Sequence, residues 1–452
     1  MSTLHSNFRT FSDCNEFIFR TITDHREFLV DGISIIKVIQ IGIKVNYNWR
    51  SLLDIHPLFE VARRLIDSQR NEQLTLAQKK IQGRSVVAID LDRYDQDKRS
   101  KNLGRYLESL EHSEFLRFIP TMVTDHSIDE TIQSPNGQGL RYGRKEAKYA
   151  MKVYRRIASL CRKHEELQPF KSSLFKAAQL YIDQWLTWKR VLAKSSIKTC
   201  LLVCHYHNEG LIHACRDLGI RVIEVQHGVI MKSSVFYVYP KSLSGALAQG
   251  LFPDEIHVFG EYWRNKLLLG GEFSPNQIRV VGDVIGEGGK IEQTSVIPPL
   301  RTLLVTSQTG MASRIEEYLR WLINDCKNKG IPYFIMIKSH PSENGNEYDS
   351  LIAEFEHVRK SNKSLIELMS LATDHLSVFS MTMFSAVAQD IKNYSLYVDA
   401  RADFINEMVI DGVTKIVEKG INIFDRQIES HKQGENVFFS PALTNAELWD
   451  KN

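Results

Sequence analysis

From Thr199 onward, the chain alternates short apolar runs rich in β-branched residues with amphipathic segments of helical period. The first unit consists of a predicted strand at 199–204, a helix at 208–219 and a strand at 221–226. Further strands are predicted at 255–260, 278–283, 302–307, 333–341, 375–380 and 395–400. Strand–helix–strand connections within one sheet make the strands parallel and the crossovers right-handed. The pattern therefore predicts an α/β protein with doubly wound parallel sheets.

The length of the chain indicates more than one domain. Its 452 residues exceed what a single hydrophobic core ordinarily supports. An irregular stretch at 231–255 interrupts the alternation, and we place the domain boundary there. We expect a first domain at 1–240, in which two long helical patterns at 144–166 and 171–192 form an insertion. We expect a second Rossmann-like domain at 241–452, with a last helix at 405–420 that could cross back to the first.

The composition is that of a globular protein, with 43% hydrophobic and 25% charged residues. A net charge of +3 gives no reason to expect nucleic-acid binding. The six cysteines are sparse and unpatterned, which favours a reducing compartment. The most apolar early segment, 28–45, is broken by three charged residues, whereas a membrane span needs about 20 mostly apolar residues. We expect a cytoplasmic protein without a secretory signal.

Three predicted strands of the second domain deliver hydroxyl, imidazole and ammonium groups to one edge of its sheet. Ligands of open parallel sheets bind at the carboxyl ends of the strands, where helix N-termini offer free N–H groups. Helix capping and strand termination would also account for each group separately. A P-loop and a G-x-G-x-x-G opening are both absent, which argues against a Walker-type or NAD site. The candidates at this edge are Ser307, Thr309, Gly310, Lys338, His340, Pro341, Ser380, Thr382 and Ser385.

The first domain places other polar residues at the carboxyl ends of its strands. His227 follows the strand "RVIEVQ", and Asp90 and Asp92 end the strand "RSVVAIDLD". The segment "CLLVCHYHNEG" brings cysteines and histidines together, but the cysteines share one strand face while His205 takes the other. That geometry does not suit a tetrahedral metal site, so we expect buried cysteines and no bound metal. The further candidates near His227 are His205, His207, Glu209 and Gln226.

Taken in order, "VIEVQHG", "DEIHVFGEYWRNKLLLGGEFSPNQIRVVGD", "LLVTSQTG", "IKSHPSE" and "FSMTMFSAVAQD" resemble the GT-B glycosyltransferases of bacterial surface-polysaccharide synthesis. This group includes capsule and lipopolysaccharide transferases and enzymes of the Kdo-transferase and sialyltransferase type. The resemblance covers about residues 198–420. It implies two Rossmann-like domains that face each other across a cleft, with a nucleotide-activated sugar in the second domain and an acceptor on the first. Where the sialyltransferase pattern has two adjacent serines, this chain has Ser-Met-Thr, so a CMP-linked donor is only one option.

By this resemblance, the candidates in the second domain would bind the donor, chiefly through His340, Pro341, Ser380, Thr382 and Ser385. Transfer also needs stabilisation of the departing phosphate and, for inversion, a base on the acceptor side. Lys338 and His340 suit the first role. His227 is the leading candidate for the base, with Asp90 or Asp92 second, although His227 could instead contact phosphate or serve as a structural residue. His205, His207, Glu209 and Gln226 would line the acceptor side.

The expected partners are a nucleotide-sugar donor and a glycan or lipid-linked glycan acceptor, with no cofactor or metal and no nucleic acid. The helix that begins at Arg144 carries basic residues among apolar ones, which suits either a solvated face or peripheral contact with anionic lipid at the inner membrane. The alternatives are a teichoic-acid-type polyol-phosphate transferase, a sugar-nucleotide epimerase, and a GT-B-like scaffold that has lost catalysis.

Overall fold

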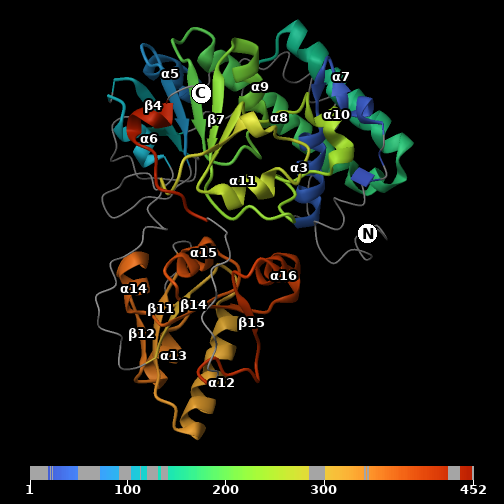
Figure 1. Ribbon diagram of the computed structural model, residues 1–452. Helices are drawn as coiled ribbons and strands as arrows, with labels where there is room; N and C mark the ends of the chain where they lie inside the picture. The colour runs from blue at the N-terminus through green and yellow to red at the C-terminus, as the bar shows by residue number, and fades with distance from the viewer. Residues whose placement is uncertain are drawn as a thin grey trace.

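The computed structural model contains two parallel β-sheets, one in each domain (Figure 1). It describes residues 19, 20, 22, 24–48, 72–90, 103–111, 113–119, 131–133, 141–284, 301–340, 343, 346–425 and 438–449. The predicted class, an α/β protein with two doubly wound Rossmann-like domains as in the GT-B fold, is confirmed.

In the described part of the chain, the first sheet has seven strands in the order β5-β4-β3-β6-β7-β8-β9, all parallel. They are β3 (Val86–Ile89), β4 (Phe115–Ile119), β5 (Thr131–Gln133), β6 (Thr199–Leu202), β7 (Arg221–Val225), β8 (Glu255–Val258) and β9 (Ile278–Val280). The helices of this domain are α3 (Ile36–Asn48), α5 (Glu72–Lys80), α6 (Gly104–Glu108), α7 (Arg144–Lys163), α8 (Lys171–Leu192), α9 (Glu209–Leu218), α10 (Ser244–Leu247) and α11 (Glu261–Leu267). A short antiparallel pair, β1 (Leu29–Val30) and β2 (Ile33–Ser34), precedes α3.

Among the residues that the structure describes, the second sheet has six parallel strands in the order β12-β11-β10-β13-β14-β15. They are β10 (Thr302–Thr306), β11 (Phe334–Lys338), β12 (Val358–Lys360), β13 (Asp374–Ser377), β14 (Lys392–Leu396) and β15 (Lys415–Val417). The helices are α12 (Ala312–Lys329), α13 (Asp349–Glu354), α14 (Leu365–Leu371), α15 (Met381–Ala388) and α16 (Ala402–Ile410).

The boundary between the sheets differs from the one predicted at residue 240. Strands β8 and β9 were assigned to the second domain, but they extend the first sheet beyond β7. The alternation of strand and helix patterns in the sequence could not reveal this, because β7 and β8 pair across the irregular stretch that had suggested a boundary. The second sheet therefore begins only at Thr302.

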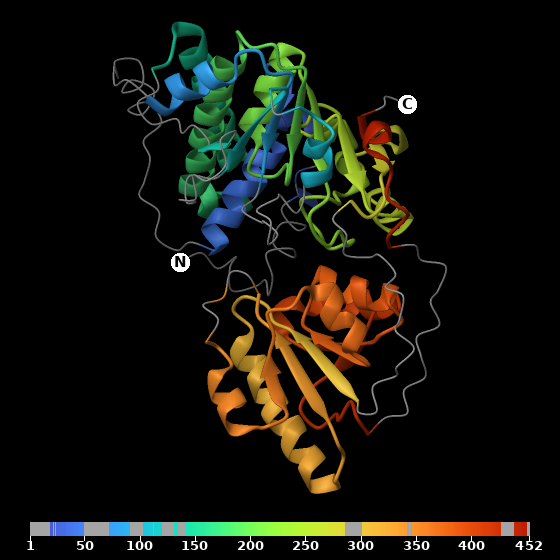
Figure 2. The ribbon, with the colours of Figure 1, turned by 90° about the vertical axis from the view of Figure 1, so that its left-hand side faces the viewer.

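The end of the chain returns to the first domain. The backbone N–H of Ser440 donates to Phe259, and that of Leu443 donates to Val281. Helix α17 (Asn445–Trp449) lies beside the first domain (Figure 2), where the Trp449 indole donates to the Ser109 hydroxyl over 2.7 Å. The element that crosses back is therefore α17 and not the helix predicted at 405–420.

The predicted helix at 405–420 is wrong in its second half. Helix α16 ends at Ile410, and Gly412 takes a left-handed backbone with φ of 72° that favours glycine. The chain then forms β15, whose residues Lys415–Val417 pair with β14 at the sheet edge. Tertiary pairing thus overrides the helical pattern of this stretch.

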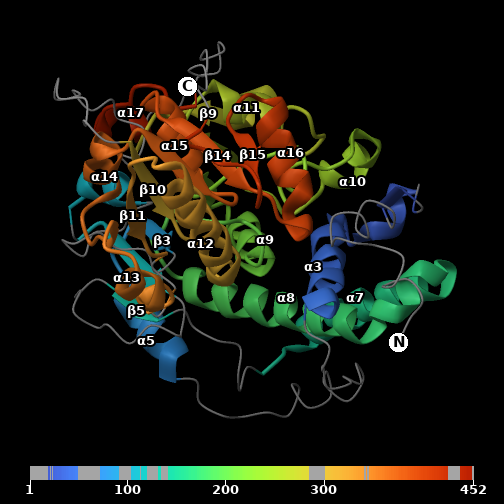
Figure 3. The same cartoon turned by 90° about the horizontal axis from the view of Figure 1, so that it is seen from below.

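The two long helices predicted before Thr199 are present as α7 and α8, and α3 packs beside α8 (Figure 3). Helix α7 buries Tyr149, Val153, Ile157 and Leu160. Its outward basic residues include Lys152, which pairs with Asp31, and Lys163, which pairs with Glu27. Several others are exposed, namely Lys145, Lys148, Arg155 and Arg162. Among the described residues, no helix has the length and apolar character needed to cross a bilayer.

An interdomain clasp, made by Tyr262 and Lys266 of α11 with Glu407 and Asp411 at the end of α16, joins the two domains. The Lys266 ammonium lies 2.8 Å from Glu407 Oε1 and 2.6 Å from Asp411 Oδ2, and the Tyr262 hydroxyl donates to Asp411 over 2.7 Å. Burial by itself would lower the pKa of Lys266, but the two carboxylates outweigh it and raise that pKa. The clasp is therefore a charged, mostly shielded contact between the domains.

Glu407 also extends the clasp toward the chain that follows His227. Its carboxylate accepts the backbone N–H groups of Lys232 and Ser233 over 2.6 and 3.2 Å. A residue of the second domain thus holds the loop that leaves the carboxyl end of β7. If one domain moves against the other, either these bonds break or the loop at Lys232 and Ser233 moves together with Glu407.

We predict that Lys266→Met destabilises the protein by about 2 kcal/mol, because it removes the cation shared by two shielded carboxylates. The midpoint of thermal unfolding should fall clearly below that of the unaltered chain. Glu261→Gln is the matched control, since Glu261 pairs with Arg264 on the same helix but is half exposed. Equal midpoints for the two variants would contradict a stabilising clasp.

Candidate functional site

Each sheet has one place where the strand order reverses, and both lie at the carboxyl ends of the strands. In the second sheet the order runs outward in both directions from the neighbours β10 and β13. In the first sheet it runs outward from β3 and β6. Connections leave these paired strands toward opposite sides, and ligands of doubly wound sheets bind in the crevice at such a point. We call these two places the switch points.

At the switch point of the second domain, Gln308 holds the ends of β10 and β13 together. Its side-chain amide donates to the carbonyl of Phe379 over 2.6 Å, and its carbonyl oxygen accepts the Phe379 N–H over 3.0 Å. This two-point bond sets the spacing of the turns that precede α12 and α15. The residues in those turns include four of the predicted donor-side residues, Ser307, Thr309, Gly310 and Ser380.

Thr309 and His340 form an exposed polar pair beside this crevice. The Thr309 hydroxyl lies 3.0 Å from His340 Nδ1. The adjacent Gly310 has φ of 78°, a left-handed turn that brings the chain into α12. The structure thus brings together Thr309, Gly310 and His340 as the sequence predicted. Pro341 lies outside the described residues.

Ser307 is less available to a ligand than its position in the sequence suggested. Its side chain is buried and bonds both to Glu343 Oε1 over 2.8 Å and to the Tyr348 hydroxyl over 2.6 Å. The other oxygen of Glu343 accepts the His340 N–H over 2.9 Å. Glu343 therefore accepts hydrogen bonds from two groups, the Ser307 hydroxyl and the His340 N–H, that could otherwise have donated to a phosphate. It also links the His340 turn to the end of β10. Lys338 Nζ donates to the carbonyl of Lys363 over 2.6 Å.

The three hydroxyl residues predicted around the start of α15 have different roles. Ser380 caps the helix by accepting the Thr382 N–H over 3.3 Å. Thr382 is partly exposed, and its hydroxyl lies 2.9 Å from the hydroxyl of Thr306, the last residue of β10. Ser385 is fully buried, with its hydroxyl toward the Met381 carbonyl, and so cannot line the crevice as predicted. Ser385 lies on the buried face of α15.

In the first domain, the turn between β6 and α9 is strained. Cys204 and His207 have φ of 76° and 72°, a left-handed backbone that is uncommon for residues other than glycine. The Asn208 amide donates to the Cys204 carbonyl over 2.9 Å, and Glu209 accepts the His207 N–H over 3.2 Å. These bonds stabilise a turn that the isolated sequence would not favour, and the turn lies at the switch point of this sheet.

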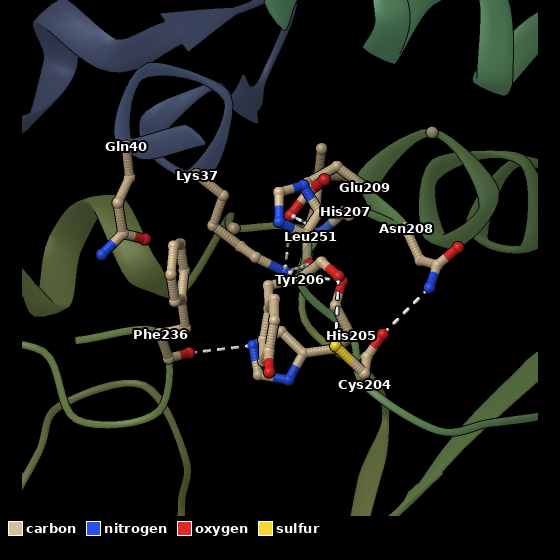
Figure 4. A network of polar contacts seen from close by, with 12 residues as sticks. Lys37, Gln40, Cys204, His205, Tyr206, His207, Asn208, Glu209, Phe236 and Leu251 are labelled. Carbon is tan, nitrogen blue, oxygen red and sulfur yellow. Dashed lines mark hydrogen bonds and ion pairs between the residues drawn. The ribbon is translucent and has the colours of Figure 1, made fainter. Parts of the chain in front are cut away.

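A buried polar cluster lies directly beneath the strained turn (Figure 4). Lys37 of α3 is fully buried, donates to the Leu251 carbonyl over 2.7 Å and lies 3.4 Å from Glu209 Oε1. His205 is also fully buried; its Nδ1 lies 2.5 Å from Glu224 Oε2 and its Nε2 lies 2.9 Å from the Phe236 carbonyl. Residues predicted for the acceptor side therefore build the support of the turn, since His205 and Glu209 are shielded from solvent.

The hydrogen bonds of His205 and Glu224 determine the net charge of this pair within the cluster. A carbonyl only accepts, so His205 Nε2 carries a proton and donates to Phe236. A second proton must lie between His205 Nδ1 and Glu224, because two acceptors would repel each other at that distance. Burial raises the pKa of Glu224, but the charge and hydrogen bond of His205 and the hydrogen bond of Tyr237 outweigh it and hold that pKa below its ordinary value. The His205–Glu224 pair is thus neutral overall.

Above the cluster, the turn carries aromatic and basic side chains. The Tyr206 ring stacks on Phe236 with centroids 4.8 Å apart, and Lys44 Nζ lies 4.5 Å from the Phe236 centroid. His207 is exposed, and His227, which is partly exposed, has its ring 6.3 Å from that of Tyr206. Of the residues predicted for this domain, His207 and His227 are therefore the two that the structure brings together at an accessible surface.

Two other predicted residues of the first domain are structural. Gln226 is buried; its side chain accepts the Phe259 N–H over 3.0 Å and donates to the Gly228 carbonyl over 2.9 Å, which joins the ends of β7 and β8. Asp90 at the end of β3 is buried, with an oxygen 3.7 Å from Arg117 Nη1. A shielded carboxylate next to a guanidinium is not placed to deprotonate an acceptor. Asp92 lies outside the described residues.

No three His, Cys, Asp or Glu side chains in the described part of the chain lie together as metal ligands would. A separate pocket is lined by Glu255, Arg264, Arg279 and Glu447 at the β8–β9 side of the first sheet, away from either switch point.

Several residues of the site escaped the sequence analysis. A signal existed for two of them: Glu224 is a charged residue within an apolar strand, and Lys37 interrupts an apolar helix. Charged residues in such positions are buried with partners. Tyr206, Phe236 and Glu343 carried no comparable signal, because their roles depend on contacts between distant segments.

No protein-family model matches this chain, and no curated protein sequence matches it. Among solved structures, it is similar to the UDP-GlcNAc 2-epimerase of Neisseria meningitidis bound to UDP-GlcNAc, with a TM-score of 0.42 and 12% identity over 74% of this chain and 88% of that one. It is also similar to MurG of Acinetobacter baumannii, with a TM-score of 0.42 and 10% identity over 76% and 88%. It is also similar to the wall teichoic acid polymerase TagF, with a TM-score of 0.37 and 9% identity over 75% of this chain and 78% of that one. Scores and identities this low say nothing about the activity of this chain.

The neutral His205–Glu224 pair predicts opposite outcomes for two substitutions of Glu224. In Glu224→Gln, the amide can donate to neutral His205 Nδ1 while its oxygen still accepts from Tyr237, so the thermal midpoint should change little. In Glu224→Leu, both His205 and Tyr237 lose a buried partner, which costs about 1–3 kcal/mol for each group. Thermal unfolding measured by circular dichroism compares the two. If Gln is as damaging as Leu, an ionised carboxylate is needed there, and the expectation that an amide can replace it is wrong.

Proposed function

We propose that this chain is a GT-B glycosyltransferase that moves a sugar from a nucleotide-activated donor to a growing cell-surface polysaccharide or lipopolysaccharide acceptor. The observation that carries the proposal is the switch point of the second domain, where Thr309 and His340 lie together at the turn into α12 and Lys338 ends the adjacent strand β11. Imidazole, ammonium and free backbone N–H groups are the donors that a diphosphate or monophosphate needs. The sequence resemblance to surface-polysaccharide transferases supports the same assignment.

On the donor side, His340 and Thr309 would contact a phosphate, and Lys338 would neutralise the charge that develops as the phosphate departs. Lys338 has to leave its bond to the Lys363 carbonyl for this, which a flexible four-carbon side chain permits. Because these groups can offset the phosphate charge, we propose transfer without a metal ion. A CMP-linked sugar is one of the donors that the resemblance allows.

On the acceptor side, His227 and His207 are accessible histidines that adjoin the strained turn. We propose His227 as the base that takes the proton of the acceptor hydroxyl, with His207 and Tyr206 contacting the glycan. The loop after His227 is held by Glu407 of the second domain, so the position of the base would depend on the position of the donor domain. We place the enzyme in the cytoplasm, with the basic face of α7 against the inner membrane.

We predict that His340→Ala weakens donor binding about tenfold or more, since it removes a hydrogen bond to a charged group. His227→Ala should leave donor binding intact and lower turnover about 10²- to 10⁴-fold, which is the usual contribution of a general base. Binding is measured by calorimetry with CMP-, UDP- and GDP-sugars, and turnover by mass spectrometry of the product formed on a glycan acceptor.

The matched control is His357→Ala, because His357 is exposed at the opposite edge of the same sheet, just before β12. It should change neither quantity. If no nucleotide-sugar binds, the transferase proposal fails. If a donor binds and is epimerised or transfers a polyol phosphate, one of the alternative enzymes replaces it. Unchanged turnover in His227→Ala would remove His227 as the base.

A further inference from the structure

A chain of four polar side chains runs inward from the switch point of the second domain. It begins at Thr382, a partly exposed residue, whose hydroxyl lies 2.9 Å from the Thr306 hydroxyl. Thr306 Oγ1 lies 2.9 Å from His375 Nε2, and His375 Nδ1 lies 2.7 Å from Asn393 Oδ1. Thr306, His375 and Asn393 are all buried. Each distance is that of a hydrogen bond, so the direction of every proton can be deduced from the inner end outward.

The orientation of Asn393 fixes the tautomer of His375. The Asn393 amide nitrogen donates to the carbonyls of Met383 and Val413 over 3.0 and 2.9 Å. A flipped amide would place its oxygen against both carbonyls, which only accept. The Asn393 oxygen therefore faces His375, and His375 Nδ1 must carry the proton that it accepts.

His375 is neutral, so its other nitrogen is an acceptor. Burial lowers the pKa of His375 to about 4, against the opposing hydrogen bond to Asn393. With Nδ1 protonated in the neutral ring, Nε2 holds a lone pair and accepts the hydroxyl proton of Thr306. A threonine hydroxyl has one proton, so Thr306 has none left for Thr382. The hydroxyl of Thr382 must then donate its own proton to Thr306.

We propose that Thr382 binds a hydroxyl group of the donor and not its phosphate. Its proton is committed inward, so toward a ligand its oxygen can only accept a hydrogen bond. A phosphate at neutral pH brings acceptor oxygens almost exclusively, whereas a sugar hydroxyl can donate. This inference rests on the proposed function and refines it: His340 and Thr309 take the phosphate, and Thr382 selects for a hydroxylated ribose or a hydroxylated transferred sugar.

Two substitutions of Thr382 test the proposal. Thr382→Val keeps the shape of the side chain and removes the acceptor oxygen, whereas Thr382→Ser keeps the oxygen. Calorimetric titration with CMP, UDP, GDP and their sugar conjugates identifies the ligand that the unaltered protein binds. Its affinity should fall roughly tenfold in Thr382→Val, as expected for one lost hydrogen bond, and should change less than about threefold in Thr382→Ser.

Deoxy ligands locate the hydroxyl without any change to the protein. If it belongs to ribose, the 2′-deoxy or the 3′-deoxy nucleotide binds the unaltered protein roughly tenfold more weakly, and Thr382→Val adds no further loss. If it belongs to the transferred sugar, Thr382→Val weakens binding of the nucleotide-sugar but not of the free nucleotide. Either result supports the proposal.

Other results overturn it. If a nucleotide binds and Thr382→Val binds every ligand as tightly as the unaltered protein does, Thr382 makes no such contact, although the donor site stands. If Thr382→Val weakens pyrophosphate binding as much as nucleotide binding, Thr382 serves the phosphate and our proton assignment is wrong. If no nucleotide or nucleotide-sugar binds the unaltered protein, the proposed function fails and this inference fails with it. Thermal midpoints of both variants confirm that they fold.

Discussion

Parallel strand pairing is the constraint on which the rest of this protein depends. Every strand in either sheet runs in the same direction, so every strand delivers its last residues to one edge. The reversal of strand order then separates two neighbouring strands' connections and leaves room for a ligand. The polar residues of this chain are effective only because that geometry gathers them. Ser380 and Thr309, 71 residues apart in number, share one crevice for this reason.

The turns at the two switch points are stabilised in different ways. In the second domain, Gln308 bonds the ends of β10 and β13 together and the Thr306–His375–Asn393 chain fills the space beneath with satisfied hydrogen bonds. In the first domain, a strained turn rests on a neutral buried cluster that contains two carboxylates, a lysine and a histidine. Buried charges are costly unless they are paired, and each carboxylate here has its cationic or shared-proton partner.

The residues best predicted from the sequence are those whose role follows from their position on a strand. The carboxyl-end locations of His227, His340 and Thr309 follow from alternation alone, and the structure places all three at partly or fully exposed positions. Which side chains are exposed was predicted less well. Ser385, Gln226, Asp90, His205 and Glu209 are at or near strand ends too, but they turn inward, and a one-residue difference in helical or strand phase decides this. The domain boundary at 240 failed for a related reason, because β7 and β8 are neighbours in space across a long irregular segment.

The sequence by itself determined the class of fold, since strand and helix periods are local properties of hydrophobic spacing. It also determined that polar groups end the strands of both sheets. Only the tertiary structure decided which of those groups face a ligand, which strands belong to which sheet, and how the end of the chain returns to the first domain. The direction of the protons from Thr382 to Asn393 is the clearest case. It depends on two carbonyls, those of Met383 and Val413, which no sequence pattern links to Thr382 and which meet Asn393 only in the folded chain.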